Sequence, residues 1–340
     1  MRRNDLTARI GIGVAMAAGL LLGGAGAKAA PPTYAVTAHI PGPDGFWDYV
    51  TFDQVKRRVY LSRADGVAFV DADTGQLTAH LADGQRTHSV LPLPGGERLI
   101  VTNGATGTAS LIDAASGALI ASIPAGEKPD GAIYDPATGR VLVMSHTGIV
   151  SVIDPKAAKP DGAITVGGSL EFATDDGKGR AYVDVESQNL IAVIDVKART
   201  VVARYPLAGC TAPGGIAYDG RLKVLIASCG NNVAKVLSAA DGKELASLAI
   251  GKGPDAVFVD EGRRLAFIPC GRDGVLEVIS LADPKHIAVV QTLATQPGAR
   301  TGTVDPKTGV VYLPTATYTL PGGIPTVTPG TFQVMVVSPS

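Results

Sequence analysis

The chain has 340 residues, of which 18% are charged and 5% are aromatic, and its formal net charge is −1. This near-neutral balance excludes the strongly basic character of a dedicated nucleic-acid-binding protein. The 42 glycines and 23 prolines favour an all-β fold with many turns, and the scarcity of aromatic residues requires a core of Val, Ile, Leu and Ala.

The N-terminal segment has the features of a secretory signal peptide. Three arginines within the first nine residues precede an uncharged run over 10–26, and Ala27-Lys28-Ala29 supplies the small-residue cleavage pattern. We predict a signal peptide over 1–29; an uncleaved membrane anchor is the alternative, which the short, Gly-rich run disfavours. No second apolar stretch of spanning length follows. We therefore expect a soluble monomer without membrane contact, either periplasmic or secreted.

From residue 34 onward the sequence repeats seven times with a period of about 42 residues. A typical copy has an Asp, a short polar turn, a basic residue and a β-rich run, as in Asp135-Pro-Ala-Thr-Gly-Arg140-Val-Leu142. A third strand in each copy ends in an element such as Val-Ile-Asp154. Repeats of this length with several short strands are typical of β-propellers. We predict one all-β domain over 34–340, a seven-bladed β-propeller with four-stranded antiparallel blades.

The two ends of this domain predict how the ring closes. Tyr34–Ile40 has the pattern of a fourth, outer strand without its blade, and Phe332–Val337 that of a third strand without a fourth. Joined, they complete blade seven and remove exposed sheet edges. A long Pro/Gly/Thr segment over 315–331 interrupts the same blade. It is either a surface loop or a flap over one face.

The three cysteines suggest one disulfide in an oxidising compartment. Cys210 directly precedes the inner strand of blade five, and Cys229 ends the next strand, which returns to the same face. Cys270 is equivalent to Cys229 in the neighbouring blade, and such positions are usually too far apart for a bond. We predict a Cys210–Cys229 disulfide and a free Cys270.

One register position gathers ionisable side chains. The residue five positions before each repeat anchor lies near the start of an innermost strand and is expected to face the central funnel. Trp47 adjoins this ring and either lines the funnel mouth or packs between blades. In chain order the ring positions hold Asp48, His88, Asp130, Glu171, Gly214, Asp255 and Arg300.

These side chains point to several kinds of chemistry. His88, Asp130 and Glu171 are candidate ligands of a divalent metal such as Ca²⁺, Mn²⁺ or Zn²⁺. The same groups could act as general acid and base, and Arg300 could clamp a carboxylate or phosphate. A polar lining of a water-filled channel is the simplest alternative. His146 lies on the same face, as an outer ligand or a solvated loop residue.

The Val-Ile-Asp elements, the run over 135–141 and Gly251-Lys-Gly-Pro-Asp-Ala256 resemble YVTN-type β-propellers. Over about 300 residues the chain is similar to the YncE-like exported propellers of bacteria. The resemblance implies the propeller fold and a binding role rather than turnover, with single-stranded DNA among the family's ligands. The low aromatic content and the lack of positive charge argue against nucleic acid as a partner here.

We therefore expect a non-enzymatic binding or scaffold protein that uses the funnel face for a small molecule, a metal or a protein partner. Motifs for a nucleophile elbow, a phosphate-binding loop, a dinucleotide site or a haem attachment are absent from the sequence. A metal-dependent hydrolase is the first alternative, since lactonase-like propellers also place acidic residues around a central metal. Single-stranded DNA binding, as in some YncE-like proteins, is the second.

Overall fold

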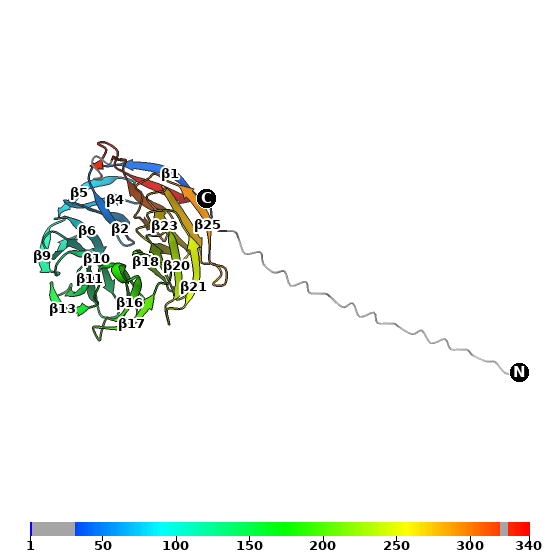
Figure 1. Cartoon of the computed structure of the whole chain (residues 1–340). Coiled ribbons are helices and arrows are strands. Elements are labelled where there is room, and N and C mark those ends of the chain that lie inside the picture. Colours follow the sequence, from blue (N-terminus) through cyan, green and yellow to red (C-terminus); the bar gives the residue numbers. More distant parts are fainter. Residues whose placement is uncertain (2–30, 320–325) are drawn as a thin grey trace. The chain divides into compact units, whose positions relative to one another are not determined.

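Seven four-stranded antiparallel sheets are arranged around a common centre as the blades of a β-propeller, which confirms the predicted fold (Figure 1). The structure is a computed structural model that describes Met1 and residues 31–319 and 326–340. Pro31–Ser340 form one compact unit. The predicted signal peptide lies outside the described residues apart from Met1. Within the part described, no helix is long and apolar enough to cross a membrane.

Each blade runs outward from its first strand. The strands of blades one to three are β2 (Trp47–Asp53), β3 (Arg58–Arg63), β4 (Gly66–Asp71), β5 (Leu77–Asp83), β6 (Thr87–Pro92), β7 (Arg98–Asn103), β8 (Thr108–Asp113), β9 (Leu119–Pro124), β10 (Pro129–Asp135), β11 (Arg140–Ser145), β12 (Ile149–Asp154) and β13 (Lys159–Thr165). Those of blades four to six are β14 (Leu170–Asp175), β15 (Arg180–Val185), β16 (Leu190–Asp195), β17 (Thr200–Pro206), β18 (Pro213–Asp219), β19 (Val224–Cys229), β20 (Val233–Ser238), β21 (Glu244–Ala249), β22 (Phe258–Asp260), β23 (Leu265–Cys270), β24 (Val275–Ser280) and β25 (Ala288–Ala294). A short 3-10 helix, η1 (Glu186–Gln188), links β15 to β16.

Blade seven joins the two ends of the chain. It consists of β26 (Thr303–Val304), β27 (Val311–Thr315), β30 (Gln333–Pro339) and β1 (Tyr34–Pro41). β1 pairs with β30 in antiparallel register from Tyr34 opposite Pro339 to Pro41 opposite Gln333. Ring closure by the N-terminal strand therefore takes the predicted form, and β30 is covered on both sides.

The Asp anchors of the repeat hold the turns between first and second strands. Asp135 is buried, and its Oδ2 accepts hydrogen bonds from the backbone N–H and the hydroxyl of Thr138. In blade seven, Oδ2 of the buried Asp305 also lies 2.8 Å from Nη2 of Arg57 in blade one. In six blades the repeated Asp thus ends the inner hairpin by a local side-chain-to-backbone bond, whereas blade two has Leu93 at this position.

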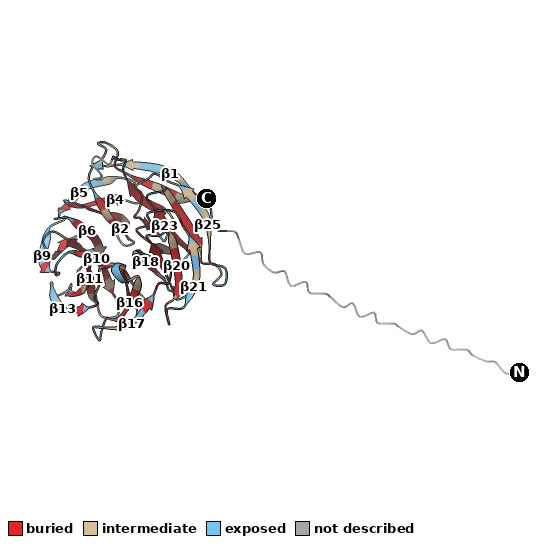
Figure 2. Cartoon of the chain, viewed as in Figure 1, coloured by how far each residue is buried: buried red, intermediate tan, exposed pale blue. Residues whose placement is uncertain are grey.

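The core lies between neighbouring blades and is dominated by Val, Ile, Leu and Ala, as the composition requires. Successive residues of a strand pack against opposite neighbours, so that Val183 joins the cluster toward blade three and Tyr182 the cluster toward blade five. Figure 2 shows buried residues concentrated in the strands nearer the centre and exposed ones in outer strands such as β13.

The segment over 315–331 contains a two-stranded hairpin of β28 (Tyr318–Thr319) and β29 (Thr326–Val327), with residues 320–325 outside the description. Its far end is fixed by Asp44, whose carboxylate accepts hydrogen bonds from the backbone N–H groups of Gly330, Thr331 and Phe332. In blade five, Cys210 and Cys229 form a disulfide with Cα atoms 5.4 Å apart, and Cys270 is a buried free thiol.

Candidate functional site

A β-bulge places each ring residue of blades one to five at the funnel. The pairing of the first and second strands shifts register there, and a bulge re-aims the side chains that it contains. In blade one the hydroxyl of Ser62 accepts a hydrogen bond from Asp48 N–H and donates one to the carbonyl of Tyr49. The shifts lie between Trp47 and Val50, Thr87 and Val90, Pro129 and Ala132, Leu170 and Ala173, and Pro213 and Gly215.

The first group of ligand-type side chains joins blades one, two and three. Nδ1 of His88 lies 2.6 Å from Oδ2 of Asp48 and 3.1 Å from Oδ1 of Asp130. The side chains of Asp48 and His88 are 25% and 18% exposed, whereas Asp130 is buried at 3%. One ligand atom from each of the three residues lies within 4.8 Å of the others, a spacing that could hold a metal ion.

The second group shares Asp130 and extends to blade four. Nε2 of His146, just beyond β11, lies 3.3 Å from Oδ2 of Asp130, and its Nδ1 lies 3.6 Å from Oε2 of Glu171. The hydroxyl of Ser169 is 3.2 Å from the same Nδ1. These three residues also satisfy the 4.8 Å spacing. His146 therefore lies directly beside Asp130 and Glu171, whereas the sequence left open an outer ligand or a solvated loop residue.

Burial and mutual repulsion make the carboxyl groups weak acids. Burial, reinforced by the charge of Asp48, raises the pKa of Asp130 to about 7. Burial, reinforced by Asp130 and Asp255, raises the pKa of Glu171 to about 9. Burial likewise raises the pKa of Asp255. Without a cation, the funnel therefore holds protons on carboxyl groups at neutral pH.

The two histidines respond in opposite directions. Burial alone disfavours the charged form of His88, but the hydrogen bond to Asp48 and the charges of Asp130 and Asp48 raise its pKa overall. Burial and the neighbouring His88 lower the pKa of His146. His146 is thus the more readily available as a neutral ligand, because metal binding requires a deprotonated nitrogen.

Asp255 and Arg300 form a separate pair on the other side of the ring. Nε of Arg300 lies 2.7 Å from Oδ2 of Asp255, and its Nη2 donates to the backbone carbonyl of Trp47 at 3.1 Å. Trp47 is only 2% exposed, and its indole packs against Tyr318 and Phe332. Its side chain thus serves the packing of blades one and seven, and its backbone orients Arg300.

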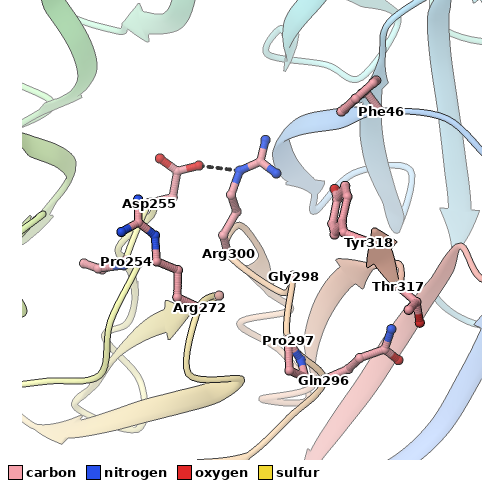
Figure 3. A pocket seen from close by; sticks show the side chains of 12 residues that line it. Phe46, Pro254, Asp255, Arg272, Gln296, Pro297, Gly298, Arg300, Thr317 and Tyr318 are labelled. Atoms are coloured by element: carbon pink, nitrogen blue, oxygen red, sulfur yellow. Dashed lines mark hydrogen bonds and ion pairs between the residues drawn. The ribbon is translucent and has the colours of Figure 1, made fainter. Parts of the chain in front are cut away.

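A cavity of about 1010 Å³ opens beside this pair. In Figure 3, Asp255 and Arg272 lie on one side of Arg300, and Phe46 and Tyr318 on the other. A smaller cavity of about 330 Å³ shares Phe46 and Arg300 with it and is also lined by Asp48 and His88. The two shared residues connect the larger cavity to the first group of ligand-type side chains.

Tyr49 is a site residue that the ring register does not contain. Its hydroxyl lies 3.5 Å from Oδ2 of Asp130, and its ring packs 4.7 Å from that of Phe172. Burial raises the pKa of this phenol well above its usual value, so it donates to the carboxylate. The sequence does distinguish Tyr49, at the position directly after each ring residue. Five of the seven copies have Ser, Thr, Ala or Gly there, and the other two have the aromatic residues Tyr49 and Phe172. At the equivalent Gly215 a Cβ would lie 2.8 Å from the backbone of Ala256, so the strands crowd together there.

The structure divides the predicted ligand set. His88, Asp130 and Glu171 do not form one cluster; His88 belongs to the group with Asp48, Glu171 to the group with His146, and Asp130 to both. Asp255 and Arg300 face the larger cavity, and Gly214 offers no side chain.

No family model and no curated protein matches the sequence. Solved structures do match the fold. A structure of the RRP9 WD40 repeats is 8% identical, with a TM-score of 0.76 over 92% of this chain and 99% of that one. The structure of U3-55K is 8% identical, with a TM-score of 0.75 over 91% and 100%. A chain of hydrazine synthase from Kuenenia stuttgartiensis is 17% identical, with a TM-score of 0.69 over 82% and 94%.

At such identities the likenesses show the fold alone. The chain is a seven-bladed β-propeller with WD40-repeat proteins among its structural neighbours. Such a scaffold fits a binding role, and what it binds has to be argued from the funnel itself.

Proposed function

We propose that this protein is a binding propeller whose central funnel holds a divalent metal ion and presents it to a small anionic ligand. The observation that carries the proposal is the convergence of His88 and His146 on the carboxylate of Asp130, from two different blades. Mixed imidazole and carboxylate ligands suit Zn²⁺ or Mn²⁺ better than Ca²⁺, which prefers oxygen ligands alone.

The charge of the funnel supports a cation as occupant. When ionised, Asp48, Asp130, Glu171 and Asp255 contribute −4 and Arg300 contributes +1, which leaves −3 with neutral histidines. A metal ion would replace the protons that the buried carboxyl groups otherwise hold.

The larger cavity supports an organic anion as the ligand beside the metal. Arg300 and the exposed Arg272 provide guanidinium groups, while Phe46 and Tyr318 provide apolar surface. Arg300 is already oriented by Asp255 and by the carbonyl of Trp47, so little side-chain entropy is lost when it binds a carboxylate or phosphate.

The test is metal binding by the protein after removal of ions with EDTA. Zn²⁺ or Mn²⁺ should be retained after dialysis and gel filtration, with affinity at least tenfold weaker in His146→Ala. The matched control is His80→Ala, since His80 is exposed and pairs with Asp83 on blade one, away from the funnel. Absence of retained metal in the unmodified protein, or equal weakening in both variants, would refute the proposal.

Metal-dependent hydrolysis is the second candidate, and Asp255 is the observation that favours it. Its pKa is raised by burial and it borders the larger cavity, so it is placed to accept a proton from a water or ligand bound in that cavity. Lactone turnover by metal-loaded protein, abolished in Asp255→Asn with unchanged metal content, would establish an enzyme. Without turnover, binding remains the function.

We further propose that the protein works outside the cytoplasm. The Cys210–Cys229 disulfide supports this, because structural disulfides persist mainly in oxidising compartments. The check is cell fractionation of the full chain and of a chain lacking residues 1–29. Equal amounts of both in the cytoplasm would contradict export.

A further inference from the structure

Asp130 faces the two histidines with different oxygens. Its Oδ1 lies 3.1 Å from Nδ1 of His88, and its Oδ2 lies 3.3 Å from Nε2 of His146. The carboxylate itself is 3% exposed and comes from the bulge in β10. It therefore separates two half-sites, one on the side of blades one and two and the other on the side of blade four.

The nitrogen and oxygen atoms around Asp130 are spaced closely enough to become neighbouring ligands of a metal ion. Bonds of about 2.0–2.2 Å from a metal to nitrogen or oxygen place tetrahedral neighbours about 3.3–3.6 Å apart. The contacts of Asp130 with Nδ1 of His88 and with Nε2 of His146 are 3.1 and 3.3 Å, close to this range, and a carboxylate oxygen of Glu171 lies within 4.8 Å of the ligand atoms of Asp130 and His146. Only the 2.6 Å contact between Asp48 and His88 has to lengthen appreciably.

A single ion cannot engage all five residues. Among the described residues, the ligand atoms that lie within 4.8 Å of one another form two groups of three, and no such group contains all five. One ion would therefore occupy one half-site and leave the other with uncompensated carboxyl groups.

We propose that the funnel takes two divalent ions bridged by the carboxylate of Asp130. Asp48 and His88 complete the first site, and His146 and Glu171 complete the second. The inference rests on the proposed metal-binding function and specifies how that site is occupied. A carboxylate with one metal on each oxygen holds the pair at the separation of about 3.5–4 Å that two-metal sites show.

Charge also favours two ions and indicates what binds between them. Ionised Asp48, Asp130 and Glu171 contribute −3, so one divalent ion leaves −1 and two ions leave +1. A net positive pair with three protein ligands on each ion accepts an anionic oxygen across the open positions. The ligand class is therefore an oxyanion, carried by an organic group that extends toward Arg300 and Phe46.

The surrounding hydrogen bonds orient the bridge. The hydroxyl of Thr102 donates to the backbone carbonyl of Asp130 at 2.7 Å, and Tyr49 donates to Oδ2 at 3.5 Å. Ser169 lies 3.2 Å from Nδ1 of His146, which leaves Nε2 free to bind the metal. Outer hydrogen bonds of this kind fix the orientation and tautomer of metal ligands.

The experiment is Mn²⁺ titration of the EDTA-treated full protein, followed by equilibrium dialysis and electron paramagnetic resonance. We expect two Mn²⁺ per chain at saturation and an exchange-coupled spectrum from the bridged pair. Glu171→Gln should bind its second ion at least tenfold more weakly and show an uncoupled six-line spectrum at one equivalent. His80→Ala, outside the funnel, should match the unmodified protein.

The unmodified protein alone decides the result, so a variant that fails to fold does not obscure it. Saturation at one Mn²⁺ with an uncoupled spectrum would overturn the bridge and leave the proposed function standing. Two uncoupled ions would also overturn it. No binding of Mn²⁺ or Zn²⁺ would remove both the inference and the proposed function.

Discussion

Asp184 in β15 is a fully buried carboxyl group, and neither of its oxygens has a hydrogen-bond partner. It is the penultimate residue of the second strand, where blades one, two and five have a hydroxyl instead. Those hydroxyls, on Ser62, Thr102 and Ser228, each donate to a backbone carbonyl of an inner strand. We predict that Asp184→Thr stabilises the protein by restoring this bond in blade four.

The expected gain in the free energy of unfolding follows from the missing hydrogen bonds of Asp184. A buried polar group left without a partner costs about 1–3 kcal/mol, and a new hydroxyl-to-carbonyl bond contributes about 1 kcal/mol. The expected gain near pH 4, where the carboxyl group is largely protonated in both states, is therefore about 2–4 kcal/mol. In thermal unfolding at a fixed scan rate this corresponds to a rise in Tm of several degrees.

The sign of the pH dependence tests the cause. Burial raises the pKa of Asp184 well above its usual value, so the folded state holds a proton that the unfolded chain releases. Stability from this group is present below the unfolded pKa of about 4 and is lost as pH rises. The advantage of Asp184→Thr should be smallest near pH 4 and should grow toward pH 8.

The assay is a set of Tm measurements from pH 4 to pH 8 for the unmodified protein, Asp184→Thr and Thr102→Val. The last variant removes the equivalent hydroxyl in blade two and should lose about 1–3 kcal/mol at every pH. If Asp184→Thr lowers Tm, or shifts it equally at all pH values, then Asp184 has an ionised role in the fold and the reasoning is wrong.

Three further predictions concern ring closure, the disulfide and the funnel. Arg57→Ala should cost about 2 kcal/mol at pH 7, because it removes the cationic partner of the buried Asp305, which keeps its hydrogen bonds from Lys307 N–H and the hydroxyl of Thr308. The hydrogen bond to Arg57 helps hold the pKa of Asp305 below its usual value, so the cost should shrink as pH falls below about 4; a pH-independent loss in urea unfolding would contradict this. Replacing Cys210 and Cys229 by Ser should cost about 3 kcal/mol under oxidising conditions, and equal stability of the Cys and Ser proteins without reductant would argue against the bond. In EDTA-treated protein, Glu171→Gln should raise Tm above that of the unmodified protein, and by more at pH 8 than at pH 4.5. The reason is that the pKa of Glu171 is raised to about 9, which makes folding of the unmodified protein less favourable as pH rises above the unfolded pKa. Parallel Tm curves for Glu171→Gln and for an exposed control, Glu97→Gln, would refute that assignment.

The periodicity of the sequence was sufficient for the fold and for the register of the funnel. Because every copy repeats the same hairpin, a fixed offset from Asp135 or Asp219 finds the residue at the start of the inner strand in its blade. The missing strands at the two ends likewise predicted the pairing of β1 with β30. Both features depend on the spacing within one copy, or on the incomplete copies at the two ends of the chain, and such spacing can be read directly from the sequence.

Contacts between different blades are not contained in such a pattern. The approach of His146 to Glu171 depends on how the end of β11 lies beside the inner strand of blade four. Trp47 directly precedes the ring residue Asp48 in the sequence. Its indole nevertheless packs against Tyr318 in the hairpin of blade seven, 271 residues away in the chain. Spacing along the chain gives the register of such residues but not which neighbour their side chains reach.

The funnel has chemistry that the fold itself does not require. Gly214 occupies the ring position in blade five without any side chain, and that blade still forms a complete four-stranded sheet. The crowded carboxyl groups of Asp130 and Glu171 make the metal-free protein less stable as pH rises above about 4, because their pKa values are raised to about 7 and about 9. Closure by β1 and the ion pair between Arg57 and Asp305 stabilise the ring independently of the funnel. The funnel carboxyl groups therefore oppose folding of the metal-free protein, and the blades do not need them to form. Such a cluster is expected where a bound cation offsets the repulsion between the carboxylates.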